Sequence, residues 1–404
     1  MKFKIIYLFF IVCAFLYGSY HIAGPLTLRQ VAAILMCVIC LFESKTFYID
    51  KYLKGYFVFV AFWLISSLAT GNIVEYFQDL IGFVFVAYIG YWATIILKKK
   101  YDSLHILVYA LIFIGMFDAV ITICQSLYIP VFDSFLELLH LEPVNEKFLS
   151  KQSREVDMMF VAIPGLYGSP VNNGHYLMIS FITSFALQRY HFKPVGLVFS
   201  IIILVGLFFC QQRGPFYLGV LLLTLILYVT YFRGKSIAKK VLMAFIVIAI
   251  AVLAVPTYLQ NSSLLESRMS RGAEDEVRSE LYANTPEWLA EHPLGGIYEL
   301  RKIRAPHNFF LNAFVIGGWL GGMFVIYVLF VQLKPIAKVC LKTVSEKNYL
   351  TFIFAVAYLG ITGNSMVHNV SIITGDVASW IIWAAFLSNK QSKNQCLKGW
   401  KLFL

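Results

Sequence analysis

The sequence has little charge. Only 14% of its 404 residues are Asp, Glu, Lys or Arg, against about 25% in a typical soluble domain. Hydrophobic residues make up 59% of the chain, the mean hydropathy is +0.74, and the apolar residues fall into successive blocks of about 17–25 residues. This pattern excludes a soluble enzyme and a disordered chain. It predicts an all-α integral membrane protein whose residues 1–404 form one polytopic domain.

Cysteine is also scarce, and common cofactor motifs are missing. The seven cysteines lie in or beside apolar blocks or in short basic segments, so a secreted disulfide scaffold is excluded. Cys37 and Cys40 form a C-x-x-C inside an apolar run, where small membrane-helix residues are expected rather than a redox pair. The sequence contains no phosphate loop, Rossmann glycine pattern, H-E-x-x-H or paired Cys/His spacing. Nucleotide-driven chemistry and zinc hydrolysis therefore have no support, and we expect no cofactor; whether a metal assists stays open at this point.

The apolar blocks predict about twelve transmembrane helices, since a bilayer core needs about 20 apolar residues per helix. The first block is expected to be a retained span rather than a signal peptide, because no small-x-small cleavage site follows it. The predicted spans are 5–20, 28–44, 56–71, 76–97, 104–128, 173–188, 193–210, 214–232, 239–257, 307–333, 349–367 and 371–388.

The basic residues predict the orientation. With a cytoplasmic N-terminus, 22 of the 33 Lys and Arg fall on the inside, and the alternation holds through all twelve spans. Both termini are therefore predicted to be cytoplasmic, and the net charge of +11 is mainly topogenic lysine, not a nucleic-acid surface. Of the 22 inside residues 20 are Lys, whereas eight of the 11 outside are Arg, at positions 29, 154, 213, 268, 271, 278, 301 and 304.

This bias toward arginine indicates an outer face that binds an anion, because the planar guanidinium holds phosphate or carboxylate through two hydrogen bonds. Ordinary salt bridging remains the alternative, since residues 257–305 also hold eight acidic residues. Two long outer loops, 129–172 and 258–306, exceed the length of simple connections and are expected to be functional. In the second loop, residues 275–291 predict two short helices broken at Thr285-Pro286.

Two outer positions suggest chemistry. His307 precedes Asn308 at the predicted start of the tenth span, where a general base would lie at the water–lipid boundary; a simple polar helix end is the alternative. Arg213 follows a strongly apolar run, so it needs a carboxylate or a ligand anion. Asp118, deep in the fifth span, is a candidate partner for Arg213, and it is also the residue that a proton-coupled transporter would use. Arg29 is expected to be an interfacial anchor.

Four short motifs follow one another between residues 160 and 325. They are GSPVNN at 168–173, QQRGPFYLG at 211–219, the stretch from Arg278 through Trp288 to HPLGGI, and APHNFFLNAFVIGGWLGG at 305–322. Their order resembles that of the O-antigen ligase/polymerase superfamily, with its G-x-x-x-N, S-R-G and R…W…P-x-x-G…H-N…G-x-x-G motifs. Gln212 stands where that family usually has Ser. The glycines at 317, 318, 321 and 322 predict close helix packing.

The resemblance implies a lipid-linked glycosyltransferase of GT-C-like architecture in the bacterial inner membrane, with a periplasmic active site. Members move a glycan from undecaprenyl pyrophosphate to an acceptor hydroxyl and use no nucleotide sugar. By position, Arg213 and Arg278 would hold the pyrophosphate, and His307 would act as base or orient the acceptor. Substrate binding would fall to Arg301, Arg304, Asn308, Asn172 and Asn173.

Three functions stay open at this point. The first is an O-antigen or related polysaccharide polymerase, because the SPVNN motif resembles polymerases more than ligases. A chain-length regulator protein would be a partner of such a polymerase. The second is an O-antigen ligase that transfers polysaccharide to lipid A–core. The third is a flippase for lipid-linked sugars, which twelve spans would also suit. A transporter, however, should place its polar sites near the midplane in two related halves, and the polar residues here gather in one outer loop.

Overall fold

The computed structural model describes residues 2–16, 21–23, 26–44, 46–127, 129, 163–167, 169–188, 193–210, 212–232, 283–298, 308–342, 344–345, 348–366, 373, 375–390 and 399–401. The chain divides into two compact units. The first comprises residues 1–110, 278–339 and 350–404, and the second comprises residues 111–277 and 340–349.

The first unit is helical apart from two short antiparallel strand pairs. Its helices are α1 (Lys2–Leu16), α2 (Leu28–Glu43), α3 (Lys51–Ala69), α4 (Ile73–Asp79), the π-helix η1 (Leu80–Phe85), α5 (Val86–Tyr101), the helix 283–291, α16 (Phe309–Cys340), α17 (Tyr349–Ser365) and α18 (Val377–Lys390). The strands β1 (His21–Ala23) and β2 (Leu26–Thr27) form one pair, and β3 (Thr46–Tyr48) and β4 (Gly399–Lys401) form the other.

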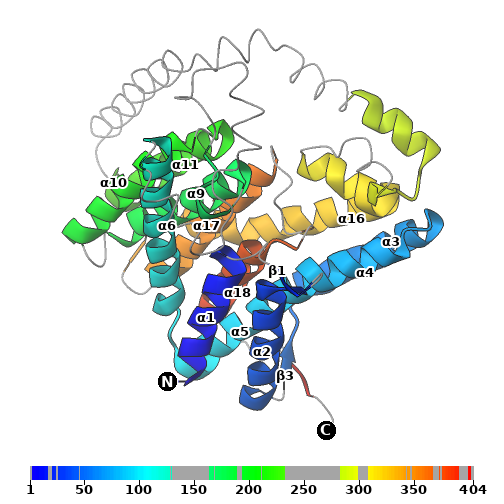
Figure 1. Ribbon diagram of the computed structural model, residues 1–404, viewed down its shortest axis with the longest axis horizontal. Coiled ribbons are helices and arrows are strands. Elements are labelled where there is room, and N and C mark those ends of the chain that lie inside the picture. Colours follow the sequence, from blue (N-terminus) through cyan, green and yellow to red (C-terminus); the bar gives the residue numbers. More distant parts are fainter. Residues whose placement is uncertain are drawn as a thin grey trace. The chain divides into compact units, whose positions relative to one another are not determined.

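Helices α5 and α18 pack side by side at the centre of this unit (Figure 1). Every residue of α18 from Val377 to Ser388 is buried, and so is nearly all of α5, as expected for helices that are apolar all round. A Cβ at Gly90 of α5 would lie 2.8 Å from Cγ1 of Ile381. The two helices are therefore as close as a glycine contact permits.

Asp50 ties three helices together at the start of α3. Its carboxylate accepts hydrogen bonds from the backbone N–H of Tyr52 and Leu53, from the Tyr91 hydroxyl of α5 (2.8 Å) and from the Trp383 indole of α18 (3.1 Å). The first two bonds form an N-cap. A buried carboxylate is stable here because four donors replace its water.

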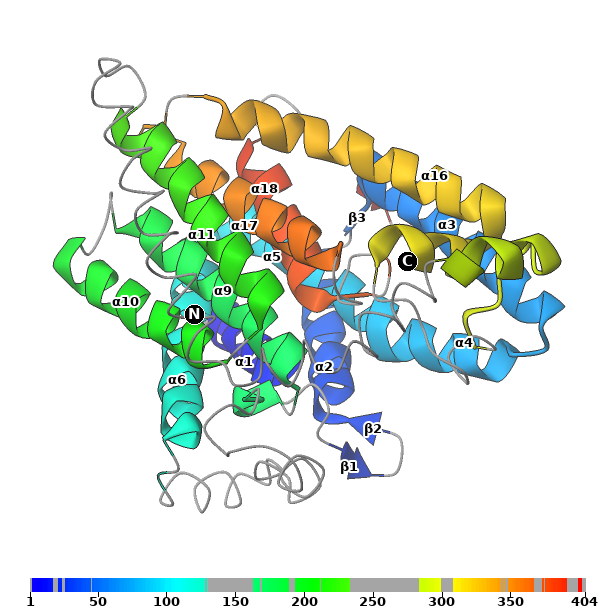
Figure 2. The same cartoon turned by 90° about the horizontal axis from the view of Figure 1, so that it is seen from above.

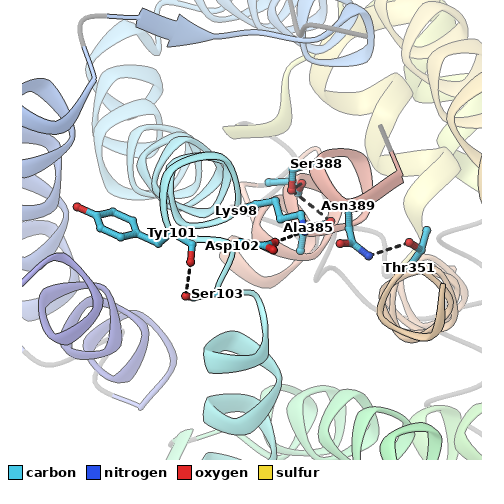
Figure 3. A network of polar contacts seen from close by, with 9 residues as sticks. Lys98, Tyr101, Asp102, Ser103, Thr351, Ala385, Ser388 and Asn389 are labelled. Carbon is cyan, nitrogen blue, oxygen red and sulfur yellow. Dashed lines mark hydrogen bonds and ion pairs between the residues drawn. The ribbon is translucent and has the colours of Figure 1, made fainter. Parts of the chain in front are cut away.

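The helix ends near α5 carry a second polar group (Figure 3). Lys98 pairs with Asp102, which ends α5 in a left-handed conformation. Close by, the Asn389 amide of α18 donates to the Thr351 hydroxyl of α17 at 2.8 Å. The end of α5, the start of α17 and the end of α18 therefore lie together.

The second unit contains most of α6 (His105–Ser126), the 3-10 turn η3 (Gly165–Tyr167), α9 (Pro170–Leu187), α10 (Lys193–Phe209), α11 (Arg213–Leu227) and the π-helix η4 (Tyr228–Phe232). Helix α9 packs against both α10 and α11. Buried serines join α9 to α10, with Ser184 Oγ and Ser200 Oγ 2.9 Å apart.

Every predicted span except 239–257, which lies outside the described residues, holds a helix. Within the described part of the chain, four helices are long and apolar enough to cross a membrane: Lys51–Ala69, Ile73–Tyr101, His105–Ser126 and Phe309–Cys340. Three further apolar helices are shorter. The fold is therefore that of an all-α membrane protein, and the total of twelve spans stays a prediction.

One predicted span is wrong in its path. The tenth was expected to be a single helix over 307–333, but α16 is interrupted at Gly318, whose φ is 66° and ψ is −171°. A Cβ at Gly322 would lie 2.8 Å from the Cα of Phe314, whereas residues eight apart in a straight helix are about 12 Å apart. The short helix 309–317 therefore folds back along the long helix 319–340 (Figure 2).

The far end of the short helix confirms this path. Phe309 lines a cavity of ≈ 20 Å³ together with Val325, Val328, Leu329 and Gln332. These four residues belong to the middle of the long helix, so Phe309 lies beside that middle and not beyond its end. The glycine cluster has two roles as a result. Gly317 and Gly321 pack closely against the α3 rings of Phe59 and Phe62 as predicted, and Gly318 supplies the break.

Candidate functional site

In the second unit, two of the four motifs meet. A Cβ at Gly174 would lie 2.8 Å from Cβ of Gln212 and 3.1 Å from Cγ of Pro215. Only a glycine allows α9 to approach the start of α11 this closely. The GSPVNN and QQRGPFYLG segments are therefore neighbours, and Arg213 is the first residue of α11. The Arg213 side chain lies outside the described part of the structure.

The asparagines of GSPVNN differ in exposure. Asn173 is fully buried, and its amide nitrogen donates to Thr122 Oγ1 (3.0 Å) and to the carbonyl of Ile163 (2.9 Å). Asn172 is half-buried. The described contacts of Asn173 therefore hold the chain in place, and Asn172 is the one of the pair that a solvent-borne group can reach.

Asp118 binds the turn 163–167, which Asn173 also holds through the carbonyl of Ile163. It is fully buried in α6, and its Oδ1 accepts the backbone N–H of Leu166 at 2.9 Å. Gln125, near the end of the same helix, donates to the carbonyl of Gly165 at 3.5 Å. The described bond of Asp118 thus goes to the turn 163–167 that precedes GSPVNN. Its predicted pairing with Arg213 is not tested, because that side chain is not described.

In the first unit, the other two motifs meet at the Gly318 break. In an unbroken helix the N–H of Trp319 would bond to the carbonyl of Val315. Instead Trp319 N–H donates to the carbonyl of Pro293 at 3.1 Å, and the carbonyl of Val315 accepts the N–H of Gly296 at 2.8 Å. The turn 293–296 of HPLGGI thus occupies the gap in the helix and satisfies both of its open backbone groups.

A continuous helix spans residues 283–291, directly before this turn. Thr285 and Pro286 lie in its first turn, where proline is well tolerated, so the predicted break at Thr285-Pro286 is wrong; residues 275–282 lie outside the described part. The Trp319 indole donates to the carbonyl of Leu289 at 3.2 Å. After the turn, the Tyr298 hydroxyl donates to Asp79 Oδ2 at 3.0 Å.

Asn308 caps the short helix of α16. Its Oδ1 accepts the N–H groups of Phe310 (2.8 Å) and Leu311 (3.3 Å), and its Nδ2 donates to the carbonyl of Met366 at 3.0 Å. Because the short helix folds back, Asn308 directly precedes Phe309, which lies beside the middle of the long helix.

Four predicted site residues lie outside the described residues: Arg278, Arg301, Arg304 and His307. Arg29, the predicted anchor, places its guanidinium over the Phe83 ring, 4.4 Å from the centroid. Among the described residues, no group of three or more His, Cys, Asp or Glu is placed to hold a metal ion.

The fold and the paired motifs define a multi-pass helical membrane protein. Residues 198–326 match the family model described as O-antigen ligase. This match runs from α10 into α16, and it confirms the resemblance to the O-antigen ligase/polymerase superfamily that the motifs predict. No curated protein matches the chain.

Sequence reasoning missed Asp50 as a scaffold residue and missed the helix break at Gly318. An Asp directly before an apolar run is a helix-cap signal, which would have identified Asp50 as a cap. The Gly317-Gly318 pair is typical of a break as much as of close packing.

Proposed function

We propose that this protein is a glycosyltransferase that joins undecaprenyl-pyrophosphate-linked repeat units into an O-antigen or related surface polysaccharide, at the periplasmic face of the inner membrane. The observation that carries the proposal is the match of residues 198–326 to the O-antigen ligase family. Two pairs of the motifs also meet in the structure: the segments around Gly174 and Gln212, and the turn 293–296 with the Gly318 break.

The proposed chemistry needs fixed positive charge near a membrane surface. Pyrophosphate is the leaving group, so negative charge grows on it in the transition state, and guanidinium groups held in place stabilise that charge. Arg213 and Arg278 would take this role, with Arg301 and Arg304 beside them in sequence. His307 would remove the proton of the acceptor hydroxyl. Because the glycosyl phosphate bond is already activated, neither a nucleotide sugar nor a cofactor is required.

The contacts of two of the candidate asparagines support a scaffold role for them. Asn308 caps a helix and binds a carbonyl, and Asn173 is buried, so both would act through the backbone they hold. Asn172 remains a candidate contact for the glycan. A chain-length regulator would be a protein partner of such a polymerase.

The second candidate is an O-antigen ligase, since the matching family model carries that description. The surface glycan of a deletion strain separates the two. Lipid A–core carrying a single repeat, with the ladder lost, indicates a polymerase. Bare core with polymer left on the lipid carrier indicates a ligase. An unchanged ladder refutes both for that glycan.

Substitution of Arg213 by lysine tests the anion site. We expect Arg213→Lys to lose most of the ladder in the complemented deletion strain, because lysine keeps the charge but not the two-pronged hydrogen bonding. Arg29→Lys is the matched control, since its cation stacks on Phe83 and a lysine can do the same. Full activity of Arg213→Lys would remove the pyrophosphate role.

His307→Ala should abolish transfer with normal amounts of protein in the membrane, and a normal ladder would remove its role as base.

A further inference from the structure

The helix 283–291 leaves a tryptophan half-exposed. Its buried face carries Thr285 and Leu289, and the Leu289 carbonyl accepts the Trp319 indole of α16 at 3.2 Å. Trp288 is next to Leu289 in sequence, about 100° further round the helix, and it is half-buried. The largest apolar side chain of this helix is therefore partly open to the surroundings of the protein.

The Trp288 ring is held in place by the turn that follows the helix. The His292 imidazole lies against it, with ring centroids 4.6 Å apart and an interplanar angle of 35°. A Cβ at Gly296 would lie 3.4 Å from Cη2 and 3.5 Å from Cζ2 of the indole, and the Gly296 amide is itself bonded to the Val315 carbonyl. A ring that is already fixed loses little entropy when a ligand stacks on it.

Polar side chains border the exposed part of this ring. Asn284 and Glu291 are exposed, and they lie four residues before and three residues after Trp288, so all three share one side of the helix. The amide both donates and accepts hydrogen bonds, whereas the carboxylate only accepts them. With the imidazole they form one surface, which we call the Trp288 face: Asn284, Trp288, Glu291 and His292.

The charge of this surface disfavours a phosphate group. Residues 283–298 include two glutamates and no Lys or Arg. Glu287 and Glu291 are both exposed, and among the described residues neither has an ion-pair partner. A negative surface repels pyrophosphate, whose recognition needs cations. The same carboxylates accept hydrogen bonds from hydroxyl groups, which a sugar carries in number.

A sugar ring matches both parts of the surface. The C–H groups on the face of the ring are apolar and can lie flat on an indole, as other apolar groups do. The hydroxyl groups at its edge then reach the amide and the carboxylate on either side. A fixed aromatic surface with a few polar groups at its border is the usual composition of a small-ligand site.

We propose that the Trp288 face binds the glycan of the lipid-linked substrate, with a sugar ring stacked on Trp288 and a sugar hydroxyl donating to Glu291. This inference rests on the proposed function, which supplies the glycan. The Trp288 face would hold the uncharged sugar end of the substrate and leave the pyrophosphate to a cationic site. It is a binding site only, and none of its residues takes part in breaking or forming the glycosidic bond.

A membrane anchor is the other common use of a half-buried tryptophan in a membrane protein. An anchor contacts the headgroup region of the bilayer and has no affinity for a free oligosaccharide. Truncation of an anchor would change how the protein sits in the membrane and leave glycan binding as it was. Direct measurement of glycan binding therefore separates the two uses.

The probe is the free repeat-unit oligosaccharide, released from the strain's own surface polysaccharide by mild acid and carrying neither lipid nor pyrophosphate. NMR titration of the purified protein in detergent gives its Kd. Trp288→Ala should raise the Kd by about tenfold, because it removes one stacked aromatic surface. Tyr327→Ala, which truncates an exposed aromatic residue of α16, is the matched control and should bind like the wild-type protein.

Two results would overturn the proposal. One is the absence of binding by the wild-type protein up to about 10 mM oligosaccharide, which is weaker than a useful substrate contact. The other is an equal Kd in Trp288→Ala and Tyr327→Ala, which is the result expected of a membrane anchor.

Glu291→Gln decides the question if Trp288→Ala is missing from the membrane, because Glu291 is exposed and its replacement leaves the packing unchanged. Glutamine keeps an acceptor but loses the charge, so the Kd should rise by about threefold. Glu287→Gln is the matched control, since adjacent residues of a helix do not face each other. Equal Kd values for Glu291→Gln and Glu287→Gln would overturn the proposal.

A transfer assay separates this proposal from the proposed function. Trp288→Ala should raise the KM for the lipid-linked substrate by about tenfold and leave kcat within about twofold, because the lost contact is the same in the ground state and the transition state. A lowered kcat at an unchanged KM would overturn the binding role while the proposed function stood. An unchanged ladder in the deletion strain would refute the proposed function, and the titration measures glycan binding without any transfer step.

Discussion

The buried carboxylate of Asp118 is only partly hydrogen-bonded. Its Oδ1 binds the Leu166 amide, and its Oδ2 has no hydrogen-bond partner among the described residues. The Oδ1 of Asn173, which holds the same turn, is also without one. Three side-chain oxygens around this turn therefore have no donor among the described residues: Asp118 Oδ2, Asn173 Oδ1 and Gln125 Oε1. An amide in place of the carboxyl would keep the acceptor and add a donor.

We therefore expect Asp118→Asn to keep the ladder and to change the free energy of unfolding by no more than about 1 kcal/mol. Asp118→Ala leaves the buried Leu166 N–H unsatisfied and should cost about 1–3 kcal/mol. Thermal unfolding in detergent and the surface glycan profile measure both. Loss of function in Asp118→Asn with normal stability would instead support an ionisable role, as in a proton-coupled transporter.

Residue-level prediction reached only local contacts. Arg29 stacks on the Phe83 ring, and its role as an interfacial anchor stays a prediction. Prediction failed where a residue acts through a distant partner. Nothing near Asp50 in sequence indicates that Tyr91 and Trp383 will bind it, because those contacts depend on how α5 and α18 pack.

Among the elements, the apolar blocks predicted the helices well and their path poorly. An apolar run of residues 307–333 has the length of a span, and a helix that folds back has the same composition as one that continues. The break at Gly318 depends on a second segment, the turn 293–296, that supplies the missing bonds. Sequence spacing alone does not specify that partner.

The α5–α18 contact gives the element-scale prediction. Gly90→Ala places a methyl group 2.8 Å from Cγ1 and 3.0 Å from Cδ1 of Ile381, so the helices must separate, at a cost of about 1–3 kcal/mol. The double variant Gly90→Ala/Ile381→Ala should be less destabilised than the sum of the single variants, because each one relieves the other. Thermal unfolding in detergent measures the cycle, with Gly82→Ala as control.

Additive effects in that cycle would contradict a direct contact between the two positions. The result also bears on Asp50, because Trp383 reaches it from α18. A helix pair forced apart at Gly90 should weaken that bond as well, which is visible as a change in Trp fluorescence.

On the scale of the whole molecule, the lysine distribution predicts which side of the membrane is cytoplasmic. Lys98, Lys100 and Lys390 lie at helix ends in the first unit, and Figure 3 shows the ends of α5 and α18 beside the start of α17. The turn 293–296 lies beside the end of α3, since a Cβ at Gly296 would lie 3.2 Å from Thr70. Which of these helix ends faces the cytoplasm stays a prediction from the lysine distribution.

Cysteine labelling tests this orientation. We expect Glu287→Cys to react with a membrane-impermeant maleimide on intact cells, and Lys100→Cys to react only after the membrane is opened. The background should be low, because the free cysteines of the described residues are buried apart from the half-buried Cys37, and Cys396 can be replaced by Ser. Losing the Lys100–Glu43 pair is cheap, since both residues are partly exposed. Labelling of Lys100→Cys from outside would reverse the topology.

The folded-back helix also constrains how the protein is made. The short helix 309–317 cannot cross a bilayer core, so it cannot leave the translocation machinery as an independent span. Its capping residue Asn308 binds the carbonyl of Met366, which is 58 residues further along the chain. The helix can therefore reach its final place only after α17 has been synthesised, so the bond between Asn308 and Met366 forms late.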